Sequence, residues 1–97
     1  RCLIGPSIRS CCFEVRSDLT DRFLALFPRW EDLILKSGGR MTLDLQELNR
    51  RQLLEAGISP DHIHILPVCT FCDPSRLPSY RRDGNQARRM TSGIVLD

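Results

Sequence analysis

Two histidines and two of the cysteines have the types and spacing of metal ligands. His62 and His64 precede Cys69 and Cys72. Imidazole and thiolate are ligands that zinc prefers, and the spacing of the two cysteines is typical of zinc fingers. The histidines share one face of an expected strand, however, and a rise of ~3.3 Å per residue separates them from the cysteines unless Pro67 turns the chain back. We therefore favour a surface histidine pair with two buried thiols, and keep the four residues as an alternative zinc site.

The same cysteines have two other chemical interpretations. A thioredoxin-like redox pair needs its first cysteine at a helix N-terminus, which lowers the thiol pKa, and Asp73-Pro74 directly after Cys72 argues against a helix there. A cysteine nucleophile paired with a histidine is conceivable, but no spacing identifies one. Because the cysteine count is odd and no secretory signal precedes the cysteines, we expect reduced thiols in the cytoplasm. The remaining cysteines are expected to be small core residues: Cys2, Cys11 and Cys12.

A second group with chemical potential is a set of arginines late in the chain. Between positions 76 and 90 one acidic residue, Asp83, accompanies five arginines: Arg76, Arg81, Arg82, Arg88 and Arg89. A guanidinium group binds phosphate oxygens through two parallel hydrogen bonds and stays charged at any working pH. These arginines therefore predict a bound oxyanion. The alternative is a solvated loop that ion pairs with Asp83 and surface carboxylates hold in place. We take Arg81, Arg82 and Arg89 as candidates for binding phosphate or substrate, and assign no catalytic residue.

Charge and hydropathy narrow the range of partners. The net charge is +2 and the isoelectric point is about 8.4, which is less basic than a typical nucleic-acid footprint, and a single tyrosine near the arginines is available for base stacking. A small phosphorylated or phosphate-linked substrate suits the arginines better than a nucleic acid does. Binding of a phosphate-rich polymer by these arginines is kept as a further alternative. No stretch approaches the ~20 apolar residues of a membrane span, so we expect no membrane partner.

The elements that position these side chains alternate between strands and helices. We expect helices from Ser17 or Asp18 to Pro28, and from Asp44 to Ala56 before Gly57. Short strands are expected at 3–4, 12–15, 41–43, 62–67 and 93–96. This order predicts a mixed α/β sheet with at least two packed helices in a single segment, 1–97. Asn49 and Gln52 share the apolar face of the second helix and are expected to hydrogen-bond neighbouring backbone.

Four stretches of the chain form a combined pattern: Gly5-Pro6-Ser7-Ile8 with Cys12-Phe13-Glu14-Val15; Asp44-Leu45 with Asn49-Arg50-Arg51-Gln52-Leu53 and Gly57; Cys69-Thr70; and Ser79-Tyr80-Arg81-Arg82-Asp83-Gly84. In this order they resemble the YfiH/YlmD family of laccase-domain purine nucleoside phosphorylases. Their spacing agrees with the family over nearly the whole chain, which corresponds to the C-terminal part of the laccase domain. Arg88 departs from the family, which has a glycine there, and this predicts a reshaped loop.

The resemblance implies a CNF/YfiH-like α/β fold and an enzyme that uses phosphate to cleave adenosine, inosine or methylthioadenosine. It also implies an adenosine deaminase activity. The family was formerly described as copper polyphenol oxidases. The family holds zinc or copper with two histidines and a cysteine from motifs upstream of the four stretches. We therefore expect no metal in this segment, a requirement for the upstream half of the domain, and no activity of the segment alone. The alternative is a non-enzymatic interaction or zinc-binding module.

Overall fold

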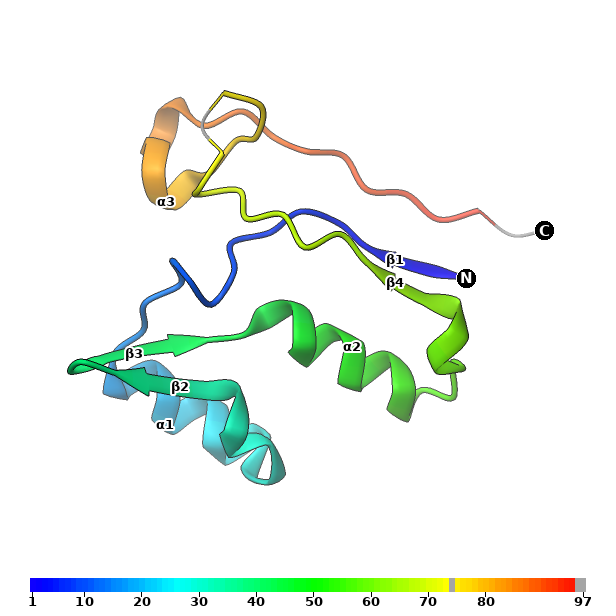
Figure 1. The fold of residues 1–97 in the computed structure, drawn as a ribbon, viewed down its shortest axis with the longest axis horizontal. Coiled ribbons are helices and arrows are strands. Elements are labelled where there is room, and N and C mark those ends of the chain that lie inside the picture. The colour runs from blue at the N-terminus through cyan, green and yellow to red at the C-terminus, as the bar shows by residue number, and fades with distance from the viewer. Residues whose placement is uncertain (74, 96–97) are drawn as a thin grey trace.

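The computed structural model describes residues 1–73 and 75–95. In chain order the elements are β1 (Cys2–Ile4), α1 (Ser17–Leu26), the 3-10 helix η1 (Pro28–Leu33), β2 (Ile34–Ser37), β3 (Arg40–Leu43), α2 (Leu45–Glu55), η2 (Pro60–His62), β4 (Ile63–Ile65), α3 (Tyr80–Asp83) and η3 (Gly84–Gln86). Helix α2 lies along the β1–β4 pair, while α1 lies beside the β2–β3 hairpin (Figure 1). The expected α/β class is confirmed.

One of the two sheets is parallel and the other is antiparallel. Strands β1 and β4 pair in parallel, with Cys2 opposite Ile63 and Ile4 opposite Ile65. Strands β2 and β3 form an antiparallel hairpin whose turn residues, Gly38 and Gly39, both have positive φ. That conformation is required at both central positions of a type I′ turn, and glycine adopts it without steric cost. The expected strand at 41–43 is confirmed as part of β3.

A small apolar core joins α1 to the hairpin. Its buried members are Val15, Phe23, Trp30, Leu33 and Leu43. The Phe27 ring stacks on Trp30 with centroids 5.2 Å apart, which extends this core to the end of α1. Of the side chains expected to form an apolar stripe on α1, Phe23 and Phe27 pack on this core, whereas Leu19 and Leu26 are 38% and 73% exposed, so the stripe is confirmed only in part. Among the described residues, none of the helices has the length and apolar content that a membrane crossing requires.

The helix ends follow local signals unequally. At α2 the Asp44 side chain accepts the N–H of Glu47 at 3.1 Å, and Gly57 after the helix has φ +97°. Both the expected cap and the expected glycine stop are confirmed. At α1 the expected cap is wrong, because the N-cap residue is Arg16 and its side chain caps nothing.

Two expected strands are absent from the described residues. The segment 12–15 forms a turn and a single bridge between Glu14 and Thr42. Residues 93–95 are extended without pairing, and Leu96 lies outside the described residues. The alternating polarity in 12–15 reflects two side chains that pack on the core, Val15 buried and Phe13 partly buried. A short alternating pattern cannot distinguish a strand from an extended loop whose alternate side chains face the core.

The buried amide of α2 is Gln46, and not the pair expected from the helical pattern. Gln46 is 3% exposed, and its Nε2 donates to the carbonyls of Gly5 at 3.2 Å and Leu66 at 2.9 Å. Asn49 and Gln52 are exposed. Helix α2 packs against the ends of β1 and β4 with the face that carries Gln46. The face that carries Asn49 and Gln52 is therefore left exposed. Gln46 thus joins α2 to both strands of the parallel pair.

Replacing Gln46 by alanine should lower the free energy of unfolding of the complete protein by about 2 kcal/mol, since two shielded carbonyls lose their donor. The measurement is a urea denaturation curve. The control, Gln52→Ala, removes an exposed amide from the same helix and should change stability by no more than about 0.5 kcal/mol. Equal effects of the two substitutions would show that Gln46 does not hold the helix to the strands.

Candidate functional site

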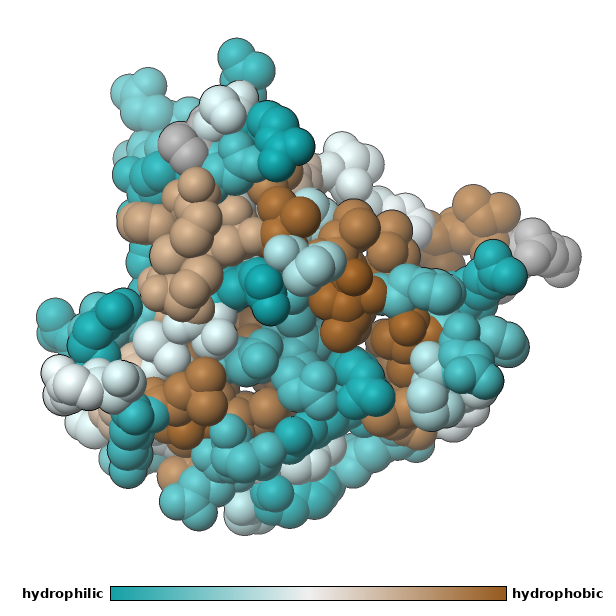
Figure 2. Space-filling view, in the orientation of Figure 1, coloured by the Kyte–Doolittle hydropathy of each residue, from teal (hydrophilic) through white to brown (hydrophobic). Residues whose placement is uncertain are grey.

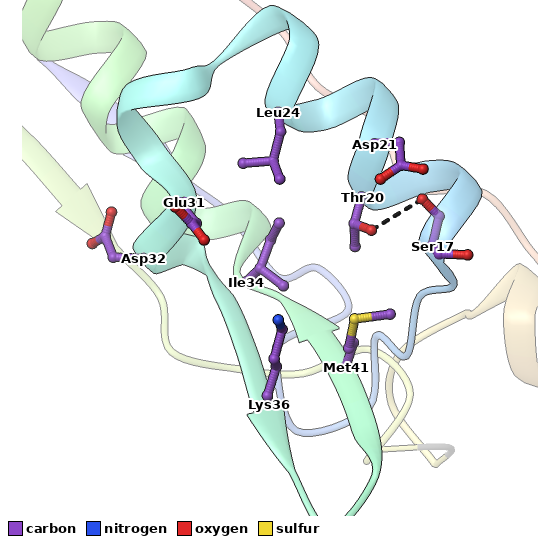
Figure 3. Close-up of a pocket in the computed structure, with 9 residues that line it drawn as sticks. All are labelled: Ser17, Thr20, Asp21, Leu24, Glu31, Asp32, Ile34, Lys36 and Met41. Atoms are coloured by element: carbon purple, nitrogen blue, oxygen red, sulfur yellow. Dashed lines mark hydrogen bonds between the residues drawn. The ribbon is translucent and has the colours of Figure 1, made fainter.

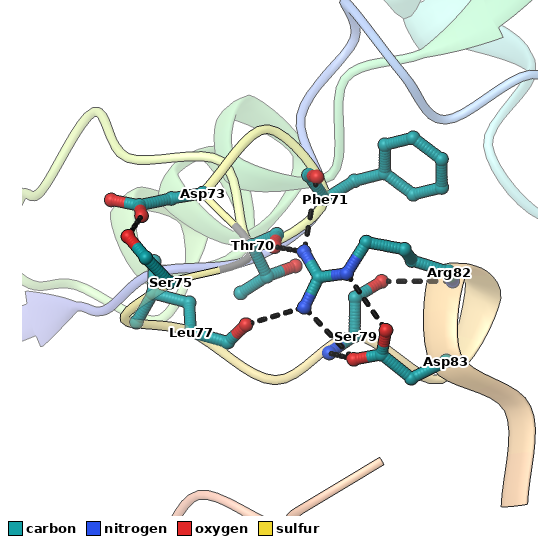
Figure 4. Close-up of polar contacts among 8 residues, drawn as sticks. All are labelled: Thr70, Phe71, Asp73, Ser75, Leu77, Ser79, Arg82 and Asp83. Carbon is teal, nitrogen blue, oxygen red and sulfur yellow. Dashed lines mark hydrogen bonds and ion pairs between the residues drawn. The ribbon is translucent and has the colours of Figure 1, made fainter. Parts of the chain in front are cut away.

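Arg82 is the most extensively bonded side chain of the arginine loop, residues 76–90. Its Nε and Nη2 donate to the two carboxylate oxygens of Asp83 at 2.9 and 2.8 Å. Its Nη1 donates to the carbonyls of Thr70 and Phe71 at 2.6 and 3.0 Å, and Nη2 also donates to Leu77 at 2.6 Å (Figure 4). A guanidinium carries five N–H groups. These contacts use all of them, so Arg82 holds the loop together in this structure.

The short helix α3 supports this arrangement. The Ser79 side chain accepts the N–H of Arg82 at 3.3 Å, and Asp83 accepts the N–H of Ser79 at 3.4 Å. These reciprocal bonds satisfy the N–H groups at the start of the helix. The hydrogen bond from Arg82 holds the pKa of Asp83 below its usual range, although burial opposes it. Gly84 ends the helix with φ +59°.

Arg81 points away from this network, toward the loop before α1. Its Nη1 donates to the carbonyl of Glu14 at 2.7 Å, and its guanidinium lies 4.7 Å from the centroid of the Phe13 ring. Both contacts leave most of its N–H groups without a partner among the described residues. Arg81 also lines a largely apolar hollow of about 380 Å³ together with Ile8, Phe13 and Tyr80.

A second, more polar hollow of about 320 Å³ adjoins the first. Its lining includes Arg88, Arg89 and Gly84, and Tyr80 borders both hollows with a side chain that is 73% exposed. No hydrogen bond or ion pair of Arg89 occurs within the described part of the chain. An apolar slot next to two arginines with available donors can hold a flat ring and an oxyanion side by side.

A larger hollow has the wrong charge for an anion. It measures about 630 Å³ and lies between α1 and the β2–β3 hairpin, with Leu24, Ile34 and Met41 as its apolar members. Figure 3 shows Asp21, Glu31 and Asp32 around it and one lysine. Clustered carboxylates repel phosphate, so this hollow does not compete with the arginine loop as a phosphate site.

Four cysteines meet where the loops after β1 and β4 run together. The Sγ atoms of Cys11, Cys12, Cys69 and Cys72 all lie within 4.8 Å of one another. We call these four residues the cysteine cluster. Neither histidine belongs to it: His64 lies in the middle of β4 and His62 directly before that strand, and both are exposed. The structure therefore places Cys69 and Cys72 beside Cys11 and Cys12, and not beside the two histidines of the alternative zinc site.

The burial of the cysteines also differs from expectation. Cys69 is buried, but Cys11 and Cys72 are exposed, and Cys2 and Cys12 are half-buried. The expectation that Cys11 is a core residue and that both cysteines of the 69–72 pair are buried is wrong. Treating cysteine as an apolar residue failed because the loops carrying these residues lie at the surface.

The thiols of the cluster differ in acidity. Burial raises the pKa of Cys69, but backbone N–H groups of Arg9, Cys72 and Phe71 and the Cys11 thiol outweigh it and lower that pKa to about 6. A hydrogen bond with Cys72, and then burial, raises the pKa of Cys12. Burial raises the pKa of Cys11. The Cys69 thiol therefore loses its proton more readily than those of Cys11 and Cys12.

Comparison with known proteins places the chain in a family. The sequence profile described as multi-copper polyphenol oxidoreductase laccase matches residues 1–97. The chain belongs to this laccase family. The family is the one that the four sequence stretches resembled, since its structural neighbours include YfiH and YlmD. The predicted family and its fold are thus confirmed.

Relatives within the laccase family are named for purine chemistry. Purine nucleoside phosphorylase YlmD of Geobacillus stearothermophilus is 38% identical over 93 residues, which covers 94% of this chain and 34% of that protein. Adenosine deaminase RL5, from an unknown prokaryotic organism, is 30% identical over 94% of this chain and 36% of its own length. The crystal structure of the hypothetical protein YfiH of Bacillus licheniformis matches with a TM-score of 0.75 and 37% identity, over 87% of this chain and 32% of that one. The chain spans about a third of the length of these proteins.

The metal in the laccase family's description can be compared with the donors of this chain. Copper redox centres combine imidazole with thiolate, whereas four thiolates in a tetrahedron are typical of zinc or iron–sulfur sites. The described residues bring four cysteines together and leave both histidines apart from them. The chain therefore has a cysteine cluster that can bind a metal, and its donors do not form a histidine–cysteine copper centre.

Proposed function

We propose that the complete protein is a purine nucleoside phosphorylase and that this chain binds its phosphate and contacts its purine. Relatives that carry this name support the reaction class. The position proposed for the phosphate and purine rests on Arg81 and Arg89, which line adjoining hollows on either side of Tyr80. Both arginines retain guanidinium N–H groups without a partner among the described residues.

Phosphorolysis determines what these side chains must do. The reaction passes through a ribosyl cation-like transition state, so the attacking phosphate must be held beneath the sugar and the departing purine must be stabilised. Arg81 and Arg89 hold the phosphate by paired hydrogen bonds in this proposal. The Phe13 ring and Tyr80 supply apolar surface for the purine. Arg82, the third predicted arginine, acts by fixing the loop that carries the other two.

The rest of the domain completes the site. Within residues 1–73 and 75–95 the β1–β4 sheet has two strands, and parallel sheets are normally covered on both faces. Apolar surface extends from this pair toward the C-terminal segment (Figure 2), and several large apolar side chains are exposed: Leu3, Leu66, Ile94 and Val95. We propose that the upstream half of the domain packs on this surface and that the chain alone is inactive.

The zinc or copper of the family belongs to that upstream half in this proposal. Its ligands are two histidines and a cysteine of the upstream half, and a divalent metal there would polarise a substrate oxygen. No step of the proposed phosphate contact passes through that metal, because the arginine loop supplies the positive charge.

The complete protein tests the reaction directly. We expect it to release free purine from adenosine and inosine only when inorganic phosphate is present, with one ribose 1-phosphate formed for each purine. Release of purine at the same rate without phosphate would indicate hydrolysis and contradict the proposal. Conversion of adenosine to inosine with release of ammonia would establish a deaminase activity in the same protein. No turnover of any nucleoside would favour the non-enzymatic interaction module.

A further inference from the structure

The cysteine cluster has the dimensions of a metal site. In a tetrahedral zinc site the Zn–S distance is about 2.3 Å, which separates the sulfurs by about 3.8 Å. The Cys72 Sγ lies 3.6 Å from that of Cys11 and 3.3 Å from that of Cys12, and all four sulfurs lie within 4.8 Å of one another. The four atoms therefore need to move by only about 1 Å or less to surround one zinc ion.

Backbone pairing brings the four cysteines together. The parallel register of β1 and β4 continues past the strands as a bridge between Ser7 and Cys69. Thr70 donates its N–H to the Ser7 carbonyl at 3.0 Å, so the loops that follow the two strands run side by side. On the first loop, Cys12 donates its N–H to the Arg9 carbonyl at 2.9 Å, and this turn directs the Cys11–Cys12 pair toward the second loop.

Neighbouring groups hold the ligand loops in place. The backbone N–H of Arg9 donates to the Cys69 Sγ at 3.4 Å, and its Nη1 donates to the Pro67 carbonyl at 3.2 Å. Arg82 bonds the carbonyls of Thr70 and Phe71, the two residues between Cys69 and Cys72. Hydrogen bonds of this kind orient the residues that bind a metal. The bonding of Arg82 thus fixes the turn that presents the second cysteine pair.

We propose that Cys11, Cys12, Cys69 and Cys72 together bind one Zn²⁺ as a structural site. Four protein ligands leave no open position on a tetrahedral ion, which is typical of structural and not catalytic zinc. Binding forms four Zn–S bonds and displaces the thiol protons to solvent, with no change in oxidation state. The ion joins the loop after β1 to the loop after β4 and so stabilises the base of the arginine loop.

Other chemistries explain the cluster less well. A disulfide joins two sulfurs at about 2.05 Å, whereas the described cysteines are all free and the Cys72 Sγ lies 3.3 and 3.6 Å from its neighbours. An iron–sulfur cluster uses four cysteines as well, but its several iron and sulfide atoms separate the cysteine sulfurs more widely than one ion does. A nucleophilic role for the Cys69 thiolate does not require the other three thiols beside it. Only a single tetrahedral ion uses all four sulfurs at the observed separations.

The first test measures metal content in the complete protein by mass spectrometry of the elements. We expect Cys12→Ser and Cys72→Ser to contain one zinc fewer per chain than the unsubstituted protein. The matched control is Cys2→Ser, because Cys2 is the cysteine of β1 that lies outside the cluster. Zinc content that is unchanged in Cys12→Ser and Cys72→Ser, or iron in place of zinc, would overturn the proposal.

The second test needs no substitution, so misfolding of a variant cannot obscure it. Zinc should protect the four cluster cysteines from iodoacetamide in the complete protein, and a chelator should expose them, as read by peptide mass spectrometry. Cys2 should react equally with and without the chelator. Alkylation of Cys11 and Cys72 without chelator, or protection that a reductant and not a chelator removes, would contradict a zinc site. Neither test uses a nucleoside, so both are independent of the proposed phosphorylase reaction.

Discussion

Replacing Arg82 by alanine should lower the midpoint of urea unfolding, because three backbone carbonyls and the Asp83 carboxylate lose the donor that joins them. The side chain of Arg82 is 18% exposed, and its loss leaves the carbonyls of Thr70, Phe71 and Leu77 without their donor and Asp83 without its partner. The measurement is urea denaturation of the complete protein. The same variant should also lose zinc more readily to a chelator, since the turn between Cys69 and Cys72 is no longer held.

Two further substitutions interpret that result. Arg88→Ala removes an exposed arginine from the same loop and should change stability by no more than about 0.5 kcal/mol. Arg82→Lys keeps the charge but cannot reproduce the five donors of the guanidinium fork, so most of the loss should remain. If Arg82→Ala were as stable as Arg88→Ala, Arg82 would not be the residue that holds the loop.

Replacing Arg81 or Arg89 by alanine should lower kcat/KM for phosphate about 100-fold in the complete protein, because each substitution removes a positive charge from the phosphate site. The KM for phosphate should rise much more than the KM for nucleoside, since the two arginines are proposed to contact phosphate and not purine. The measurement is the initial rate of purine release at varied phosphate and saturating adenosine.

Arg22→Ala is the matched control for this prediction. Arg22 is an exposed arginine on α1, outside both hollows beside Tyr80. Its removal subtracts the same charge from the protein and should leave kcat/KM within about twofold. An equal loss in Arg22→Ala would indicate a general effect of net charge. An unchanged KM for phosphate in Arg81→Ala and Arg89→Ala would remove both residues from the proposed site.

Much of the fold was predictable because its signals are local. Pro28 and Gly57 mark the ends of α1 and α2, and the paired glycines of the hairpin fix a turn of a single type. Each of these residues restricts its own backbone, so the sequence predicts the outcome without knowledge of distant contacts. The expected strand at 12–15 failed for the opposite reason, since pairing depends on a partner that the local pattern does not specify.

The cysteine cluster depended on long-range pairing and was only half predicted. The spacing of Cys69 and Cys72 suggested a metal site, but their partners lie about sixty residues earlier in the chain. The adjacent pair Cys11–Cys12 carries no spacing signal of its own. The parallel pairing of β1 with β4 brings the Cys11–Cys12 pair and the Cys69–Cys72 pair to the same end of the two strands. The sequence does not indicate that these two strands are neighbours.

The arginine loop shows a similar limit. The sequence identified Arg81, Arg82 and Arg89 as a group, because charge and residue type are visible in it. It could not separate their roles, which depend on where each side chain points. Arg82 turns inward onto backbone carbonyls, while Arg81 lies over Phe13. This difference assigns the support of the loop to Arg82 and leaves the proposed phosphate contact to the other two.

Phosphate protection of individual arginines tests the central claim most directly. The complete protein would be treated with phenylglyoxal with and without inorganic phosphate, and modification read residue by residue by mass spectrometry. Phosphate is expected to slow modification of Arg81 and Arg89 and to leave that of Arg22 unchanged. Equal modification of Arg81 and Arg89 in the presence and absence of phosphate would contradict it.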